Sequence, residues 1–517
     1  MQRSNSFASF LIALALLVTS CTTKASPSPT SQRTPLVNTP SHTSTPTEMT
    51  ATAPPASPSP PSILTPIPSA SPTLPIPSQG PYFAYMTDED SLVLHLLAPD
   101  AQGSAEMRLP TGATTHPCLS CVISPDAAWL AFWTGSLHEP GEPADGEYTL
   151  SLGLLSLTDG SAHMISNLLS DDYPMNFQAN AASLSAYLGQ EPESLAQELE
   201  WAFNIGIRVA RWSPKGRYLA FAGEMDGPSS DLYLYDTQRA TVRRLSSGRE
   251  SIMGIDWSPD GQFILQSSAY YIGQGSDFTF HATTPDGSES RSFDLHGFFG
   301  GWLSPGRLFS YQAQNGPGTF GLAVTDIATA ESHMVWPDSF EEYAYDPLNG
   351  SLLLGSPGPF FAPDGPEAGL YFMPASTWAP RMLTQGWDWN VAFMGAPEAP
   401  FVAAGGDIGT AFVSSHGVVT SFSDRSFRPY PSPDQKSIAL VGSYPENPIW
   451  LYQVGGELTE VTPTSRTFLI HWQPDSSAFF FVSDGTLYCW GCESTPLQQI
   501  DSSLMETFTS EPAWVGE

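Results

Sequence analysis

The chain has 517 residues, of which 52 are acidic and 19 are basic, and its formal net charge at pH 7 is −33. This balance argues against a nucleic-acid-binding protein, whose affinity depends mainly on neutralising phosphates, and against docking on an anionic lipid surface. We interpret the acidity as a source of solubility outside the cell. The length admits several domains or one large repeat array.

The first twenty residues predict a secretory signal peptide. Arg3 precedes the apolar run 10–18, which is too short for a lasting transmembrane span. The sequence VTSC at 18–21 resembles a bacterial lipobox, and this resemblance implies cleavage before Cys21 and lipidation of that cysteine. The acyl chains would then hold the protein in the lipid bilayer, on the extracytoplasmic face of the cell membrane or envelope. An ordinary secretory signal with an incidental cysteine is the alternative.

Residues 21–80 are rich in Pro, Ser and Thr and predict a disordered stalk. Such a segment cannot bury enough apolar surface to fold. Its reach is at most ~180 Å, at about 3.1 Å per residue. Residues 81–517 have a globular composition, with many aromatic and β-branched side chains, and form the predicted folded domain.

A turn motif recurs along 81–517, with an apolar strand predicted before and after each copy. In its fullest form the motif is Ser-Pro-Asp-Gly, in which Ser suits the first position of a type I turn, Pro the second and Gly the fourth. The copies begin at Ser124, Ser213, Ser258, Ser304, Asp346, Ser432 and Gln473.

The clearest repeat unit contains four predicted strands, 208–212, 217–223, 231–237 and 241–246. Four short strands at a period of about 40 residues are typical of a β-propeller blade. We therefore predict an all-β protein with a single propeller of about eight blades, within a range of seven to nine. Residues 511–515 are predicted to pair with 81–87, so that strands from the two ends of the domain close the ring. On that count there are nine blades, of which 388–423 is the weakest.

The repeats resemble the WD40-like repeats of the TolB-type propeller family. The resemblance is carried by WSPKGRYLAFAG at 212–223, by DLYLYD at 231–236 and by WSPDGQFIL at 257–265. It covers most of 81–517 in degenerate copies, many of which lack the final Gly, and no TolB N-terminal domain is recognisable. The resemblance implies a component of an envelope assembly.

One interval between turn motifs is about twice the repeat. We predict that it holds a small helical insertion near 181–204, because Leu195, Leu199 and Phe203 fall on one helical face and Pro192 precedes them. A divergent blade is the alternative.

Four cysteines follow Cys21, in two C-x-x-C pairs: Cys118 with Cys121 and Cys489 with Cys492. Outside the cytoplasm, neighbouring cysteines usually oxidise, so we predict two local disulfides. Cross-links between the pairs and a four-thiolate zinc site are the alternatives.

No catalytic residue, metal ligand or cofactor is assigned from the sequence. Neither a G-x-S-x-G elbow nor an H-E-x-x-H pattern occurs. Residues 88–90 form an acidic turn that we interpret as solvated. His471, on a predicted inner strand, is a candidate for lining a central channel, but a structural role is favoured.

These observations predict a binding or protein-interaction module, monomeric, whose ligand is an unknown protein or glycan at a propeller rim. The aromatic connections 385–390 and 444–450 are candidates for that rim, although aromatic residues at such places more often pack between blades. The alternative is a propeller hydrolase that cleaves glycosides or esters with carboxylates around the central channel.

Overall fold

The computed structural model describes most of the predicted domain 81–517, with gaps, and a short segment before it. The chain divides into two units, 1–60 and 61–517, and all described residues belong to the second. The described residues are 64–66, 81–88, 92–99, 104–115, 122–135, 149–170, 208–225, 229–247, 250–269, 278–294, 297–313, 320–359, 365–442, 447–462, 470–483, 486–492, 497–501 and 513–515. The predicted signal peptide, Cys21, Cys118, Cys121 and the predicted helical insertion lie outside them.

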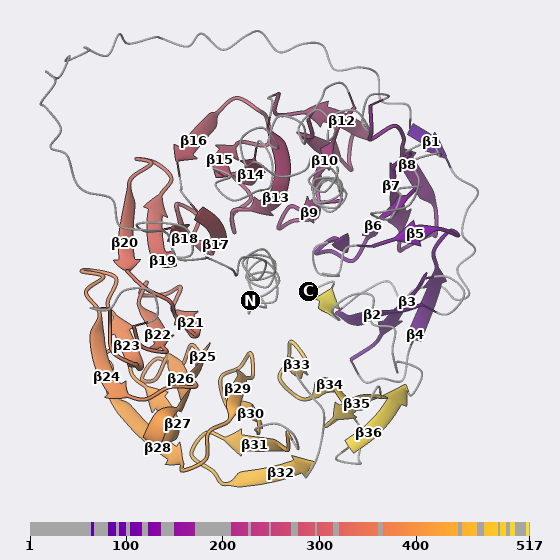
Figure 1. Cartoon of the computed structure of the whole chain (residues 1–517). Helices are drawn as coiled ribbons and strands as arrows, with labels where there is room; N and C mark the ends of the chain where they lie inside the picture. Colours follow the sequence, from indigo (N-terminus) through magenta and orange to yellow (C-terminus); the bar gives the residue numbers. More distant parts are fainter. Residues whose placement is uncertain are drawn as a thin grey trace, which may run out of the picture. The chain divides into compact units, whose positions relative to one another are not determined.

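The described strands form nine antiparallel sheets, which are arranged as the blades of a propeller (Figure 1). We number the blades in chain order from the sheet that contains β2. Blade 1 consists of β37 (Ala513–Val515), β2 (Tyr82–Asp88), β3 (Leu92–Leu97) and β4 (Ser104–Arg108). Blade 2 consists of β5 (Ala113–Thr114), β6 (Trp129–Thr134), β7 (Ser151–Ser156), β8 (Ala162–Ile165) and β1 (Leu64–Pro66). Blade 3 consists of β9 (Ala210–Trp212), β10 (Tyr218–Gly223), β11 (Asp231–Asp236) and β12 (Thr241–Arg244).

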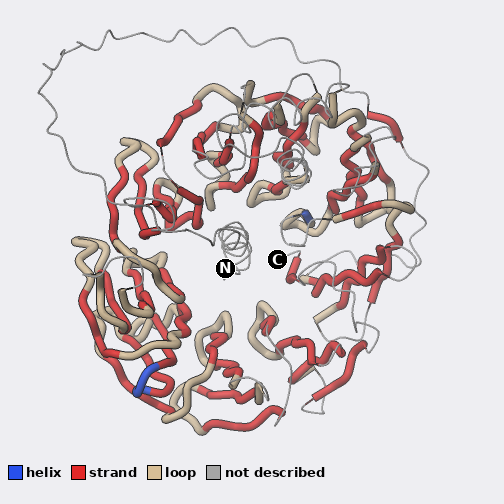
Figure 2. The backbone as a smooth tube through the Cα atoms, viewed as in Figure 1, coloured by secondary structure: helices blue, strands red, loops and turns tan. Residues whose placement is uncertain are grey.

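Blades 4 to 9 have four strands each, in the order of the chain. Blade 4 contains β13 (Ser251–Trp257), β14 (Ile264–Ala269), β15 (Phe278–Thr283) and β16 (Ser290–Asp294), and blade 5 contains β17 (Gly297–Ser304), β18 (Arg307–Ala313), β19 (Phe320–Asp326) and β20 (Ser332–Trp336). Blade 6 contains β21 (Glu342–Tyr345), β22 (Leu352–Ser356), β23 (Gly369–Met373) and β24 (Arg381–Gln385), and blade 7 contains β25 (Asn390–Phe393), β26 (Phe401–Gly405), β27 (Gly409–Val413) and β28 (Val419–Ser423). Blade 8 contains β29 (Arg428–Pro431), β30 (Ser437–Val441), β31 (Ile449–Gln453) and β32 (Leu458–Thr462), and blade 9 contains β33 (Ile470–Trp472), β34 (Phe479–Ser483), β35 (Thr486–Trp490) and β36 (Leu497–Asp501). The short 3-10 helix η1 (Gly406–Ile408) joins β26 to β27. Strands dominate the described backbone (Figure 2).

The predicted Ser-Pro turns join the first two strands of a blade and satisfy their own backbone. In the turn at Ser258, the hydroxyl donates to the Asp260 carboxylate at 2.7 Å and accepts the N–H of Phe263 at 2.9 Å. The N–H of Gly261 donates to the Ser258 carbonyl at 2.8 Å. The buried Ser side chain thus replaces the water that a turn in this place would otherwise require.

The last turn residue adopts a positive φ whether or not it is Gly. Gly261 has φ 72°, and Gln435 has φ 67° at the corresponding position. The turns between the third and fourth strands show the same feature, with Gly287 at φ 72°, Ala240 at 51° and Ala330 at 57°. Where another residue replaces the final glycine of a turn, the backbone is therefore locally strained, because residues with a Cβ are disfavoured at positive φ.

Tryptophan side chains join the first strands of successive blades. The indole N–H of Trp212 donates to the Val122 carbonyl at 2.7 Å, and that of Trp257 to the Arg211 carbonyl at 2.9 Å. Trp472 repeats this bond near the C-terminus, to the Tyr430 carbonyl at 2.8 Å. In these three blades the Trp that precedes the turn is thus a contact between blades, as well as a core side chain.

Arginine side chains join the periphery of successive blades. Arg243 of β12 donates to the carbonyls of Pro285 and Asp286 in the next blade. Arg291 of β16 donates to the Ile327 carbonyl at 3.0 Å. Arg381 of β24 likewise donates to a backbone carbonyl of the next blade, that of His416.

The structure has nine sheets, which lies within the predicted range, and the weakest predicted unit forms the complete blade 7. One part of the domain prediction is wrong: Leu64–Pro66, within the predicted disordered stalk, form β1. This strand pairs antiparallel with β8, from Leu64 opposite Ile165 to Pro66 opposite His163. The outer strand of blade 2 offers free backbone groups, and an extended segment can pair with them even where it contains a proline, because an edge strand tolerates one.

The C-terminal strand pairs with β2 as predicted, with Tyr82 opposite Val515 and Phe83 opposite Trp514. Phe83 also stacks on Phe480 of blade 9, with ring centroids 4.5 Å apart. Blade 1 therefore combines strands from distant parts of the chain.

Replacing the strained alanines by glycine should stabilise the protein. Ala240 and Ala330 are exposed, so Ala240→Gly and Ala330→Gly remove strain at little loss of packing. Relief of the positive φ outweighs the added freedom of the unfolded chain, and we expect a gain of about 0.5–1 kcal/mol for each change, or about 1–2 °C in Tm. Differential scanning calorimetry measures this shift.

Gly287→Ala is the matched control, because a Cβ at Gly287 would meet only the Leu245 side chain, at 3.5 Å. It should lower Tm by a similar amount. A fall in Tm for Ala240→Gly, or no change for Gly287→Ala, would contradict the role given to the positive φ.

Candidate functional site

The two faces of the propeller carry different kinds of connection. In an antiparallel meander, the first-to-second and third-to-fourth connections leave one edge of a blade, and the other connections leave the opposite edge. The first set gives the turn face, with short connections such as 258–263 and 284–289. The second set gives the long-connection face, where the strand bounds leave longer intervals, for example between Ser356 at the end of β22 and Gly369 at the start of β23. Variable loops on a rigid scaffold are where binding residues concentrate.

A tryptophan is exposed on the long-connection face. Trp387, in the connection 386–389 from β24 to β25, is 66% exposed, whereas Trp389 is 2% exposed. The Trp387 carbonyl accepts the N–H of Gly406 at 3.1 Å, so its backbone lies against η1. Gly386 approaches this helix so closely that an added Cβ would lie 2.6 Å from the Gly406 Cα.

A carboxylate of the preceding connection holds the Trp387 backbone in place. Glu341 accepts the N–H of Asp388 at 3.2 Å and that of Trp389 at 2.7 Å. Asp388 has φ 59°, which is strained for a residue other than glycine. The indole of Trp389 donates to the Gly386 carbonyl at 2.9 Å. These bonds fix the backbone on both sides of an exposed aromatic side chain.

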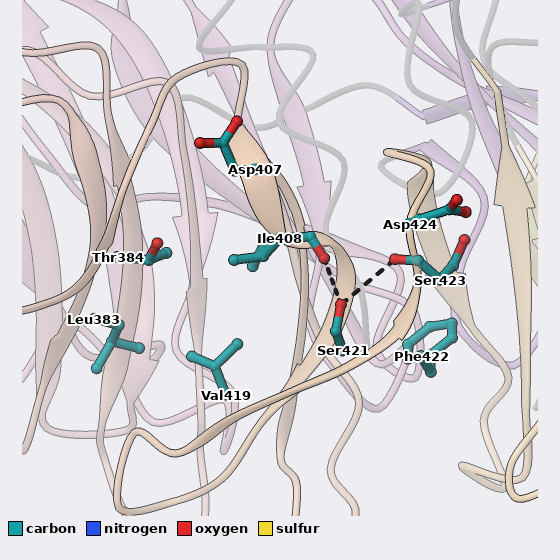
Figure 3. Close-up of a pocket in the computed structure, with 9 residues that line it drawn as sticks. All are labelled: Leu383, Thr384, Asp407, Ile408, Val419, Ser421, Phe422, Ser423 and Asp424. Carbon is teal, nitrogen blue, oxygen red and sulfur yellow. Dashed lines mark hydrogen bonds between the residues drawn. The ribbon is translucent and has the colours of Figure 1, made fainter.

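A shallow depression of about 710 Å³ lies beside this connection, between the outer strands of blades 6 and 7 (Figure 3). Leu383 and Val419 lie toward one end and Asp407 toward the other (Figure 3). Ser421 donates its hydroxyl to the Ile408 carbonyl at 2.5 Å, which joins β28 to η1. The lining residues are Leu383, Thr384, Asp407, Ile408, Val419, Ser421, Phe422, Ser423 and Asp424.

A second group of ionisable residues lies where the first strands of blades 6 to 8 begin. Glu342 of β21 pairs with Arg428 of β29 at 2.9 Å and accepts the N–H of Val391 at 3.1 Å. Burial raises the pKa of Glu342, and Arg428 opposes this shift. Burial also raises the pKa of Tyr430, the neighbour of Arg428 on β29. Sequence reasoning did not single out this group or the depression, because their members are far apart in the chain.

The predicted cysteine and histidine sites have different outcomes. Cys489 and Cys492 of blade 9 are joined by a disulfide, with their Cα atoms 5.9 Å apart. His471 packs against Phe83, with ring centroids 5.5 Å apart, and burial lowers its pKa to about 4. It is a neutral packing residue at pH 7, in agreement with the favoured interpretation. Among the described residues, no cluster of three or more His, Cys, Asp or Glu is placed to hold a metal ion.

Of the aromatic residues in the two predicted rim connections, the structure describes three, one exposed and two packed, and Tyr444 lies outside the described residues. Trp389 is buried among side chains of blades 6 and 7, and Trp450 packs in blade 8. The Arg425 guanidinium lies over the Trp450 ring, 5.4 Å from its centroid. Only the first of these connections thus presents a tryptophan to solvent among the residues that the structure describes. In those same residues, no helix is long and apolar enough to cross a membrane.

Comparison with known proteins shows the fold and no family. No family model matches the chain. The uncharacterized peptidase YuxL of Bacillus subtilis is 36% identical over 67 residues, which are 13% of this chain and 10% of that protein. The match thus spans about a tenth of that relative's length.

Among solved structures, one of a eukaryotic initiation factor has a TM-score of 0.51 at 12% identity, covering 85% of this chain and 98% of that one. The β-propeller domain of the Trilobed protease from Pyrococcus furiosus has a TM-score of 0.35 at 12% identity, covering 72% and 94%. TolB from Acinetobacter baumannii has a TM-score of 0.28 at 16% identity, covering 75% and 83%. The similarity to the initiation-factor structure concerns the fold alone, and an identity this low carries nothing about activity.

Proposed function

We propose that the protein is a binding module that recognises a protein or a glycan on the long-connection face around Trp387. The observation that supports this proposal best is the exposure of Trp387 on a backbone held by Glu341 and η1. Large aromatic side chains are usually withdrawn from water, and tryptophan is enriched among residues that dominate binding energy. A rigid connection also lowers the entropy that is lost on binding.

We propose further that the chain is an extracytoplasmic lipoprotein that is anchored in the bilayer through Cys21. The protein itself would be a monomer. The resemblance to TolB-type repeats supports a place in an assembly of the cell envelope. The VTSC sequence at 18–21 supports the anchor. In that compartment Cys118 and Cys121 would form a second local disulfide. The stalk would then be shortened by the segment 64–66, which pairs with blade 2.

A propeller hydrolase is the alternative, and one observation favours it. Glu342 is a carboxylate whose pKa is raised by burial, which is the property of a general acid. Its oxygens, however, contact Arg428 and the Val391 N–H, so they hold the first strands of three blades together. Turnover of an ester or glycoside that disappeared in Glu342→Gln, with the fold intact, would decide for the hydrolase.

We also propose that the pairing of β37 with β2 closes the ring. Deletion of residues 511–517 removes Val515, which is 4% exposed, and Trp514, which contacts Phe83. Loss of two large side chains costs several kcal/mol, so Tm should fall by more than about 5 °C. Deletion of 516–517 alone is the control and should leave Tm unchanged. An unchanged Tm in the longer deletion would refute the closure.

Removal of Trp387 should abolish partner recognition. Tagged protein is incubated with detergent-solubilised membranes and, separately, with a glycan array. Trp387→Ala should lose the bound partner because it removes the exposed anchor. Leu348→Ala is the matched control, because Leu348 is 83% exposed on the turn face, and it should bind normally. Equal binding by both variants, or no binding by the unmodified protein, would contradict the proposal.

Replacement of Cys21 should release the protein from the membrane. In a bacterial host, Cys21→Ser should lose incorporation of a palmitate analogue and move to the soluble extracytoplasmic fraction, whereas Cys118→Ser should remain labelled. A protein that stays on the membrane without label would show that the N-terminal segment is not a lipoprotein signal.

A further inference from the structure

We infer that the depression beside Trp387 binds an arginine- or lysine-bearing segment of a partner protein. This inference rests on the proposed binding function and names the chemistry of the partner. It begins from the two carboxylates of the depression, Asp407 of η1 and Asp424 at the end of β28. Both are exposed, and neither forms an ion pair or accepts a hydrogen bond from any residue that the structure describes.

The charges around the depression favour a cationic ligand. Its lining includes two carboxylates, three hydroxyl groups and apolar side chains, and it includes no basic residue. Arg425 follows Asp424 in the chain, but its guanidinium lies over the Trp450 ring. The whole chain carries 52 acidic and 19 basic residues, which gives a long-range field that attracts cations and repels anionic ligands.

The aromatic and apolar residues at the depression are suited to the charged head group and the methylene stem of an arginine or lysine. The Trp387 carbonyl accepts the N–H of Gly406, the residue before Asp407, so the backbone that carries the exposed indole lies beside η1, which forms one wall of the depression. Tryptophan is the best aromatic partner for a guanidinium or ammonium group. Leu383 and Val419, which pack together between blades 6 and 7, offer an apolar surface for the methylene stem.

The chain already uses this chemistry internally. Besides Arg425 over Trp450, the guanidinium of Arg217 lies 4.7 Å from the Tyr218 ring centroid, and that of Arg381 lies 5.9 Å from the Phe372 centroid. At the depression, by contrast, the aromatic ring and the carboxylates are present without a described cation. A basic segment from another protein would complete the same arrangement.

The test measures binding of a fluorescein-labelled (Gly-Arg)4 peptide by fluorescence anisotropy. Asp407→Asn with Asp424→Asn, and separately Trp387→Ala, should each weaken binding about 10-fold, which is about 1.4 kcal/mol. The first change removes two ion pairs with the peptide and the second removes the cation–π contact. Raising the salt to about 0.3 M should weaken binding by the unmodified protein, because exposed charges are screened.

Glu331→Gln with Glu457→Gln is the matched control. It removes the same charge from exposed positions of the turn face, and it should change the affinity less than about 2-fold, since the sites are far from the depression. Equal weakening by this control would show non-specific attraction and overturn the inference. No binding of (Gly-Arg)4, equal binding of (Gly-Glu)4 or (Gly-Ser)4, or preference for cellohexaose would also overturn it.

Failure of the peptide test can be distinguished from failure of the proposed binding function. If (Gly-Arg)4 does not bind while capture of a partner still depends on Trp387, the partner chemistry is wrong and the binding face stands. If capture is unaffected by Trp387→Ala, the binding face itself is wrong.

Discussion

The structure depends on the burial of sheet faces between neighbouring blades. A four-stranded sheet has two broad faces, and neither can be kept from water by the sheet alone. In the cluster between blades 6 and 7, Leu353 and Phe372 of one blade pack with Val391 and Phe401 of the next. Because apolar contact is not directional, polar contacts set the spacing: indole-to-carbonyl bonds near the first strands and arginine-to-carbonyl bonds at the periphery.

This arrangement leaves the connections as the variable part of the protein. The Ser-Pro turns are tight and satisfy their own hydrogen bonds, so the turn face is regular. The opposite face carries the long connections, and there a carboxylate such as Glu341 can hold a neighbouring loop. A rigid loop on a rigid scaffold can keep a tryptophan in water without letting it collapse onto the core.

Few basic residues occur, and several of those described act within the fold. Arg243, Arg291 and Arg381 donate to carbonyls of adjacent blades, and Arg428 pairs with Glu342. Carboxylates consequently remain on the surface without partners among the described residues, as at Asp407 and Asp424. The negative net charge of the chain therefore produces a field that attracts cationic groups and repels anionic ones.

The repeat and its turns could be predicted from the sequence because they depend on local chemistry. Ser-Pro-Asp-Gly satisfies its hydrogen bonds within a few residues, and alternating apolar strands follow directly from it. The pairing of 513–515 with β2 was also predictable, since the last segment matches a first strand. The strand at 64–66 was missed, because its three residues pair with an edge that only the folded blade 2 provides.

The sequence by itself determined the fold class, the positions of the strands within the repeat units and the turn chemistry of this protein. Only the tertiary structure decided which aromatic residues are exposed to solvent. Trp387 and Trp389 stand two positions apart in one connection, yet one is in solvent and the other is packed between blades. The physical reason is that exposure depends on which strands of the next blade approach, and the contacts of Glu341, η1 and β28 that decide it join residues far apart in the chain.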